Sequence, residues 1–238
     1  MSRVKALLAF TLLASSAISS VKAQSLRVSP VTIELPAGAE SAVFTLGTDS
    51  KEGVAVQARI FRWSQAGGED KLDKTEDVVI SPPVLTVHGG TPSTLRLVRV
   101  AKTPVSGEET YRVLIDEIPD RKKLQSGSVA LQVRQSVPVF FAGFDARRGS
   151  ITWKAVERHS KLVIEATNGG QRHIRVNTLA VTDEKNRDLL KGGWGYVLNG
   201  QSKKWELQAD AAGAKTLTIK AETETGPVNA SVSVGKGG

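Results

Sequence analysis

The side chains that most often do chemistry in proteins are few and scattered in this sequence. The three histidines, His88, His159 and His173, have no partner at ligand spacing and no adjacent carboxylate cluster, a pattern that argues against a metal or catalytic site. There is no cysteine, which excludes disulfides, thiolate metal sites and a cysteine nucleophile. The glycine-rich segments lack the lysine and the strand-to-helix context of a phosphate-binding loop. We therefore expect no enzyme, no metal, no cofactor and no small-molecule substrate.

The charge balance of the 238-residue chain needs a similar test, because its net charge is +8. A basic excess raises the question of a nucleic-acid partner. The basic run at residues 121–123 has no interleaved aromatic residues, as a nucleic-acid platform would have. Removal of residues 1–23, with three basic and no acidic side chains, lowers the net charge to +5. We expect no nucleic-acid partner.

Residues 1–23 have the pattern of a secretory signal peptide. Arg3 and Lys5 precede an apolar run from 6 to about 18, and the segment ends in small residues at Ala23. The apolar run is shorter than the roughly 20 residues that a transmembrane helix needs. We expect cleavage after Ala23 and export of the mature protein; a short N-terminal anchor is the alternative.

The rest of the chain alternates short β-branched and apolar stretches with turn residues, which predicts strands and no helix. The first half has seven candidate strands: Leu26–Leu35, Ala42–Thr48, Val54–Trp63, Val78–Ile80, Thr94–Val100, Tyr111–Glu117 and Val129–Phe141. Seven such segments are typical of an immunoglobulin-like sandwich. The small and charged stretch 142–150 is interpreted as a hinge. The second half continues with Ile151–Glu157, Lys161–Thr167, Ile174–Val181, Tyr196–Leu198, Lys203–Leu207, Lys215–Ala221 and Val228–Val234. The sequence predicts an all-β protein with domains at 24–143 and 144–238, the second a smaller β-sandwich.

Two predicted strands depart from a plain sandwich strand. In Leu26–Leu35 the apolar side chains change face at Pro30, so this strand should bend or change sheets. Val129–Phe141 is about twice the usual strand length and keeps its apolar residues in odd positions, interrupted at Gln135. An alternating apolar row on an exposed edge is an aggregation hazard unless it has a partner. An ordinary core strand with a long tail is the alternative.

The motifs and their order resemble the periplasmic pilus-assembly chaperones of the chaperone–usher pathway, in particular their divergent, archaic-type branch. The resemblance covers nearly all of the mature chain. It rests on Val28-Ser29-Pro30-Val31, Pro36-Ala37-Gly38, Ser81-Pro82-Pro83, Tyr111-Arg112-Val113-Leu114, Glu117-Ile118-Pro119 and Val137-Pro138-Val139-Phe140, and in the second half on Thr152-Trp153-Lys154, Asn168-Gly169-Gly170-Gln171-Arg172-His173 and Gly195-Tyr196-Val197-Leu198.

The resemblance implies two immunoglobulin-like domains arranged as an L and a strand lent to pilin subunits. The lent strand would lie in the last predicted strand of the first domain. The residues expected to point into the subunit are Val129, Leu131, Val133 and Val137. Val139 and Phe141 are expected in the protein's own core. The implied partners are pilus or fimbrial subunits and an outer-membrane usher, the implied compartment is the periplasm, and the unbound protein could self-associate. The Ser81-Pro82-Pro83 turn is similar to a family turn with a cis proline.

One departure concerns the anchor for the C-terminal carboxylate of the subunit. Most family members use an Arg in the first strand and a Lys near the end of the last strand, and here these places hold Thr32 and Pro138. The substitutes suggested by position are Arg99, Arg134 and Arg27, because an Arg fork suits a carboxylate.

Two other functions remain open on the sequence. An exported β-sandwich adhesin or carbohydrate-binding module would need exposed aromatic residues, and aromatic residues make up only 5% of the chain. A hydrolase is disfavoured because the catalytic motifs are missing.

Overall fold

The computed structural model describes residues 26–119, 133–158, 161–207 and 213–236. These residues form strands and turns and no helix, so the described part contains no apolar helix that could cross a membrane. Strands of the first half are β1 (Leu26–Ser29), β2 (Ile33–Leu35), β3 (Ser41–Thr48), β4 (Val54–Ala66), β5 (Glu69–Lys74), β6 (Val78–Ser81), β7 (Val84–Val87), β8 (Ser93–Arg99), β9 (Glu108–Glu117) and β10 (Arg134–Ala142). Strands of the second half are β11 (Ile151–Arg158), β12 (Lys161–Asn168), β13 (Ile174–Asp183), β14 (Asp188–Val197), β15 (Ser202–Glu206), β16 (Thr216–Thr223) and β17 (Gly226–Lys236).

The first half is a sandwich of two sheets. One sheet has the order β1-β3-β8-β6, and the other has the order β2-β10-β9-β4-β5, with β7 paired to β4. Alternate residues of each strand face inward, as a half-buried strand requires. Phe44, Leu95 and Val113 are at most 1% exposed and belong to one core between the sheets.

The first predicted strand is two strands. β1 pairs with β3 in the four-stranded sheet, and β2 pairs with β10 in the other sheet. The peptide bond between Ser29 and Pro30 is cis, and it lies where the change of sheets was predicted. The Ser81–Pro82 bond is also cis, as the turn motif indicated.

The second half forms one seven-stranded sheet with the order β14-β13-β16-β17-β11-β12-β15. The sheet folds over so that its edge strands β14 and β15 contact each other, and Trp205 Nε1 donates to the carbonyl of Trp194 at 3.2 Å. Ile164, Leu179 and Leu217 are fully buried in its core. The chain is all-β, with the two immunoglobulin-like domains that the sequence predicted.

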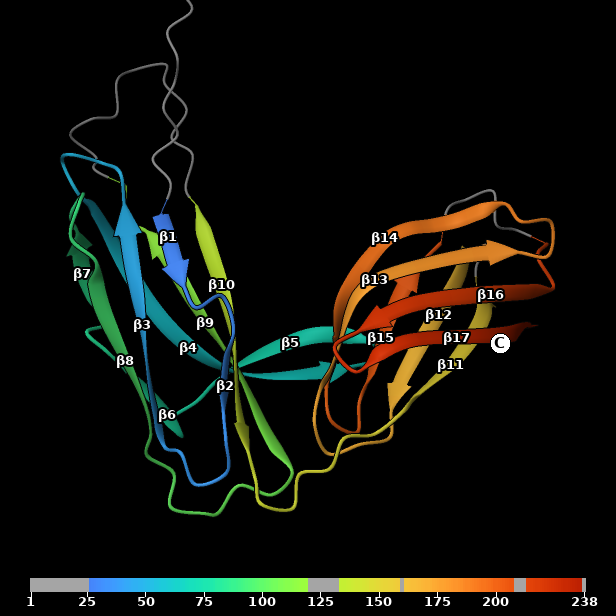
Figure 1. Cartoon of the computed structure of the whole chain (residues 1–238), viewed down its shortest axis with the longest axis horizontal. Coiled ribbons are helices and arrows are strands. Elements are labelled where there is room, and N and C mark those ends of the chain that lie inside the picture. Colours follow the sequence, from blue (N-terminus) through green and yellow to red (C-terminus); the bar gives the residue numbers. More distant parts are fainter. Residues whose placement is uncertain (1–25, 120–132, 159–160, 208–212, 237–238) are drawn as a thin grey trace, which may run out of the picture.

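The two domains lie at an angle to each other, with the β4–β5 hairpin reaching from the first to the second (Figure 1). Of the predicted hinge at 142–150, residues 143–150 carry no strand, whereas Ala142 is the last residue of β10. The domain boundary at 143/144 stays a prediction. Trp63 and Phe140 of the first domain pack with Tyr196 and Leu198 of the second in a small buried cluster. The interface therefore has an apolar centre.

Three strands were either not predicted from the sequence or predicted too short. Every residue of β5 is exposed, so it has no apolar alternation to detect. β7 has only four residues. β14 runs through Gly192 and Gly193, and only its last two residues fall in the predicted strand Tyr196–Leu198.

Candidate functional site

The two edges of β10 are paired over different lengths. One edge pairs with β9 along its whole length, from Arg134 opposite Asp116 to Ala142 opposite Glu108. The other edge pairs with β2 only at 139–141. Among the described residues, no strand lies against this second edge at 134–138. An edge of this kind can accept an added strand through backbone hydrogen bonds.

The odd-numbered side chains of β10 point into the first domain. Val137, Val139 and Phe141 are at most 2% exposed and belong to the sandwich core. The prediction that Val139 and Phe141 lie in this core is confirmed. The prediction that Val137 points into a subunit is wrong, because Val137 sits opposite Val113 in the β9–β10 ladder and the facing sheet covers both.

The remaining predicted donor residues lie before β10. Val133 is half-buried and directly precedes the strand. Val129 and Leu131 fall outside the described residues. The donor role of Val129, Leu131 and Val133 therefore stays a prediction.

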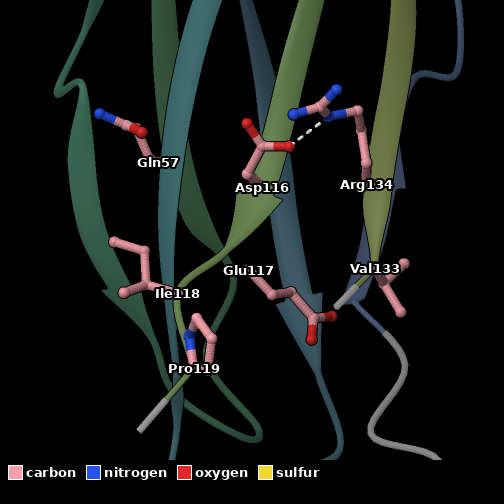
Figure 2. A pocket seen from close by; sticks show the side chains of 7 residues that line it. All are labelled: Gln57, Asp116, Glu117, Ile118, Pro119, Val133 and Arg134. Carbon is pink, nitrogen blue, oxygen red and sulfur yellow. Dashed lines mark hydrogen bonds and ion pairs between the residues drawn. The ribbon is translucent and has the colours of Figure 1, made fainter. Parts of the chain in front are cut away.

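Val133 lines a pocket of about 430 Å³ where β9 ends and β10 begins (Figure 2). Its other lining residues are Gln57, Asp116, Glu117, Ile118, Pro119 and Arg134. Ile118 is 43% exposed, and burial raises the pKa of the Glu117 carboxyl. The pocket places partly apolar surface beside the start of the open edge.

The polar side of this pocket is an ion-pair cluster. Asp116 accepts from Arg134 Nε at 2.5 Å and from Arg59 at 2.6 Å. The hydrogen bond from Arg134 is the largest cause of the lowered pKa of Asp116. Arg134 is therefore exposed but paired, and its role as a carboxylate anchor stays a prediction.

Arg99 is not available as an anchor, which corrects the sequence prediction. It is 7% exposed, and its guanidinium donates to both carboxylate oxygens of Glu109, each at 2.8 Å. It also donates to the carbonyls of Ala101 and Thr103. Because four donors are already used inside the domain, Arg99 fastens the end of β8 to β9 and has little left for another chain.

Arg27 is also placed away from the open edge. It lies on β1, in the four-stranded sheet, and pairs with Asp49 at 2.5 Å on the surface. β10 belongs to the other sheet. The structure does not bring Arg27 together with Arg134, so the predicted anchor set is not one site.

Arg112 is a further candidate anchor, which was not predicted from the sequence. Arg112 of β9 is opposite Pro138 of β10, one of the two positions at which the sequence departs from the pattern that the resemblance implies. Its guanidinium carbon lies 3.8 Å from the centre of the Trp63 ring, and its Nη1 donates to Ser136 Oγ at 3.1 Å. Its side chain is 17% exposed, and its carboxylate contact, Asp70, is 3.8 Å away.

The electrostatics of Arg112 differ from those of Arg99. Burial lowers the pKa of Arg112, and the charge of Asp70 offsets this only in part. Hydrogen bonds from Arg99 to Glu109 raise the pKa of Arg99 instead. A partly buried cation with one distant counter-ion is stabilised when a further anion binds beside it. The signal in the sequence is a charged residue inside the apolar Tyr111-Arg112-Val113-Leu114 stretch.

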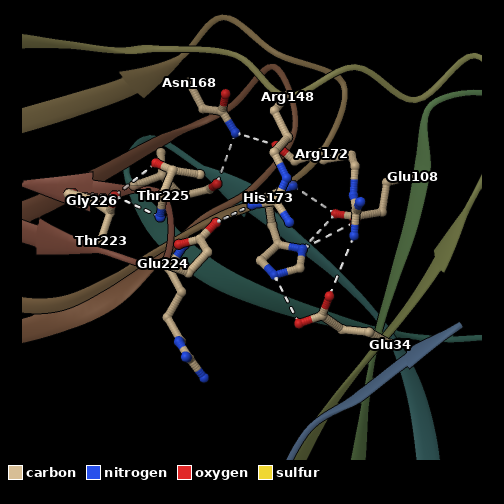
Figure 3. Close-up of polar contacts among 12 residues, drawn as sticks. Glu34, Glu108, Arg148, Asn168, Arg172, His173, Thr223, Glu224, Thr225 and Gly226 are labelled. Carbon is tan, nitrogen blue, oxygen red and sulfur yellow. Dashed lines mark hydrogen bonds and ion pairs between the residues drawn. The ribbon is translucent and has the colours of Figure 1, made fainter. Parts of the chain in front are cut away.

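The first residue of β9, opposite the last residue of β10, makes a buried polar contact with the second domain (Figure 3). Glu108 has a fully buried side chain, and it accepts from the backbone N–H of His173 at 2.7 Å. The His173 ring also contacts this carboxylate at 2.9 Å and stacks on Phe140 with ring centroids 3.6 Å apart. Arg172 reaches Glu34 of β2 at 3.3 Å.

His173 is thus a structural residue of the interface. In the part of the chain that the structure describes, no group of three or more His, Asp or Glu side chains is arranged to hold a metal ion. Thr32, the other position of that departure, has its hydroxyl oxygen 3.4 Å from the Tyr196 hydroxyl across the same interface.

Comparisons with known proteins agree with this fold. Residues 25–142 match the family model described as pili and flagellar-assembly chaperone, PapD N-terminal domain. No curated protein matches the sequence significantly.

Several solved structures have the same fold. The chaperone–adhesin complex CsuC–CsuE, from archaic chaperone–usher Csu pili of Acinetobacter baumannii, matches with a TM-score of 0.68 and 22% identity, over 89% of this chain and 99% of that one. The Salmonella enterica SafA pilin in complex with the SafB chaperone matches with a TM-score of 0.60 and 18% identity, over 89% and 98%. The Pseudomonas aeruginosa CupB2 chaperone matches with a TM-score of 0.54 and 16% identity, over 86% and 98%.

Proposed function

Because residues 25–142 belong to the family of pili and flagellar-assembly chaperones, we propose that this protein captures pilus subunits by adding the open edge of β10 to them. The observation that carries the proposal is the one-sided pairing of β10 at 134–138. A subunit strand laid along this edge would gain backbone hydrogen bonds, which depend little on its sequence.

Apolar side chains beside the edge supply the second part of the affinity. Val133 continues the odd-numbered row that lines the sandwich core. Beyond the end of the core the same row would enter a groove in the subunit, together with Leu131 and Val129. Burial of each such side chain contributes about 1.5 to 3 kcal/mol.

Arg112 is the proposed receptor for the C-terminal carboxylate of the subunit. It lies across the ladder from Pro138, which cannot itself donate a hydrogen bond. A carboxylate at Arg112 would fix which residues of the subunit strand face which residues of β10. Loss of a charge pair of this kind typically costs about 2 to 5 kcal/mol.

The proposed cellular setting follows from the same role. The chain would act in the periplasm after removal of residues 1–23 and pass its subunit to an outer-membrane usher. The open edge of β10 would also allow two unbound copies to associate.

Co-purification with the cognate pilin subunit tests the proposal. We expect Val133→Glu to abolish capture, because a carboxylate in an apolar groove is desolvated without a partner. Val43→Glu is the matched control, since Val43 is 59% exposed on β3, a strand paired on both edges. Equal capture by both variants would show that β10 is not the donor.

A second measurement tests the anchor. Arg112→Gln should remove the preference for a subunit with its native C-terminus over one with an extended C-terminus. Arg96→Gln, at an exposed position on β8, should keep this preference. If Arg112→Gln still prefers the native C-terminus, Arg112 is not the carboxylate anchor.

A further inference from the structure

The β4–β5 hairpin makes a second contact between the domains, separate from Glu108 and His173. It extends from the six-stranded sheet to β15 (Figure 1). The backbone N–H of Lys204 donates to the carbonyl of Gly68 at 3.1 Å. The Lys204 ammonium donates to the carbonyl of Gly67 at 2.6 Å. The tip of the hairpin is thus fastened to the second domain.

Gln65 lies just before the tip of the hairpin. Its side-chain amide makes the two hydrogen bonds that a backbone peptide group of a neighbouring strand would make. Its Oε1 accepts from the backbone N–H of Leu198 at 3.0 Å, and its Nε2 donates to the carbonyl of Tyr196 at 2.8 Å. Leu198 is fully buried and Tyr196 is 8% exposed. Buried backbone groups need such partners. The Gln65 side chain therefore completes the end of β14 from the other domain.

The Gln65 side chain also contacts a cluster of charged residues. Gln65 Nε2 also donates to Asp70 Oδ1 at 2.9 Å. Lys203 of the second domain lies 3.4 Å from Asp70 Oδ1, and Arg112 of the first lies 3.8 Å from Asp70 Oδ2. Both cations are only 17% exposed. Two cations from different domains thus converge on one carboxylate, leaving the cluster with a net positive charge.

We propose that the β4–β5 hairpin clamps the two domains, and that Gln65 and Gly68 thereby position Lys203 beside Arg112 to complete the binding site for the subunit carboxylate. The second part rests on the proposed function. Two separated contacts are needed to define an orientation, because either one alone leaves rotation about it. With the clamp open, the domains could rotate about the Glu108–His173 contact and carry Lys203 away from Arg112.

The turn of the hairpin offers a matched pair of variants. Gly67 and Gly68 have φ of 62° and 90°, which suits a type I′ turn and tolerates Asn better than other side chains. A Cβ at Gly68 would lie 2.4 Å from Lys204 Cγ, whereas a Cβ at Gly67 meets nothing within 4 Å. Gly68→Asn should therefore open the clamp and Gly67→Asn should not.

The domain orientation is measured without a subunit. The chain contains no cysteine, so Lys51→Cys and Lys220→Cys, both at exposed positions, can carry spin labels for pulsed EPR. We expect a narrow distance distribution in the parent and in Gly67→Asn. We expect a broad one in Gln65→Ala and Gly68→Asn. Narrow distributions in both of these variants would overturn the clamp.

The coupling to the carboxylate site is measured with the cognate pilin, native and C-terminally extended. Gln65→Ala should reduce the preference for the native terminus about tenfold. Lys203→Met should reduce it similarly while the distance distribution stays narrow, a separation that a merely structural effect would not give. An unchanged preference in Lys203→Met, or in Gln65→Ala with a broad distribution, would overturn the coupling.

Failure of the proposed function has a different signature. If Val133→Glu and Val43→Glu capture the subunit equally well, β10 is not the donor, and the claim about the carboxylate site falls with it. The EPR distances would still decide the clamp. If Val133→Glu loses capture while Gln65→Ala keeps its terminus preference, the donor role stands and the positioning role is refuted.

Discussion

Substitution of Glu108 should weaken the interface between the two domains. The side chain is fully buried, and in Glu108→Gln an amide NH₂ replaces one of the two oxygens that face His173 and Arg172. The remaining oxygen can still accept the backbone N–H of His173. Removal of one partner of a buried pair costs about 3 to 5 kcal/mol, and the retained hydrogen bond places this change near about 3 kcal/mol.

Urea unfolding followed by tryptophan fluorescence measures this loss, because Trp63 and Trp205 report on different domains. A loss of about 3 kcal/mol corresponds to a fall in melting temperature of roughly 6 to 12 °C for a chain of this size. Glu206→Gln is the control: its ion pair with Lys161 has both side chains 65% exposed and should contribute less than about 1 kcal/mol. Equal stabilities of the two variants would refute the reasoning.

Three further outcomes are expected. Burial raises the pKa of the Glu109 carboxyl, but hydrogen bonds from Arg99 and Tyr111 outweigh burial, so the folded pKa lies below the ordinary value of 4.5. The resulting contribution to stability is complete above about pH 4.5 and is lost as the pH falls through the folded pKa, so Glu109→Gln should flatten the decline of acid-unfolding curves below about pH 4.5. Gly149→Ala should lower the melting temperature and Gly169→Ala should not, because a Cβ at Gly149 would lie 2.1 Å from Gly170 N while one at Gly169 meets only Ser150 O at 3.9 Å; equal melting temperatures would contradict this. Arg99→Ala should lower stability, and Arg27→Ala should leave stability unchanged; neither should alter the preference for a native subunit terminus, and a lost preference in either would restore it as an anchor.

The sequence by itself determined the features that depend on local pattern. Period-two alternation gave the all-β class and most of the strands, since inward and outward positions alternate along any half-buried strand. Pro30 marked the change of sheets, because a residue without a backbone donor interrupts a ladder wherever it stands. The resemblance of the motifs to pilus chaperones agrees with the family match of residues 25–142.

Only the tertiary structure decided which of these side chains are available to bind another chain. Val133 and Val137 have the same residue type and phase, and the difference in their burial comes from how far the facing sheet extends over β10. Arg99 and Arg112 look alike in sequence. In the structure Glu109 pairs closely with Arg99, whereas the charge of Arg112 is balanced only in part, because its counter-ion Asp70 is more distant. β5 carries no apolar pattern, and its importance comes from reaching β15 of the other domain. Long-range register and the approach of two domains set these properties, and neither is encoded in a short stretch of sequence.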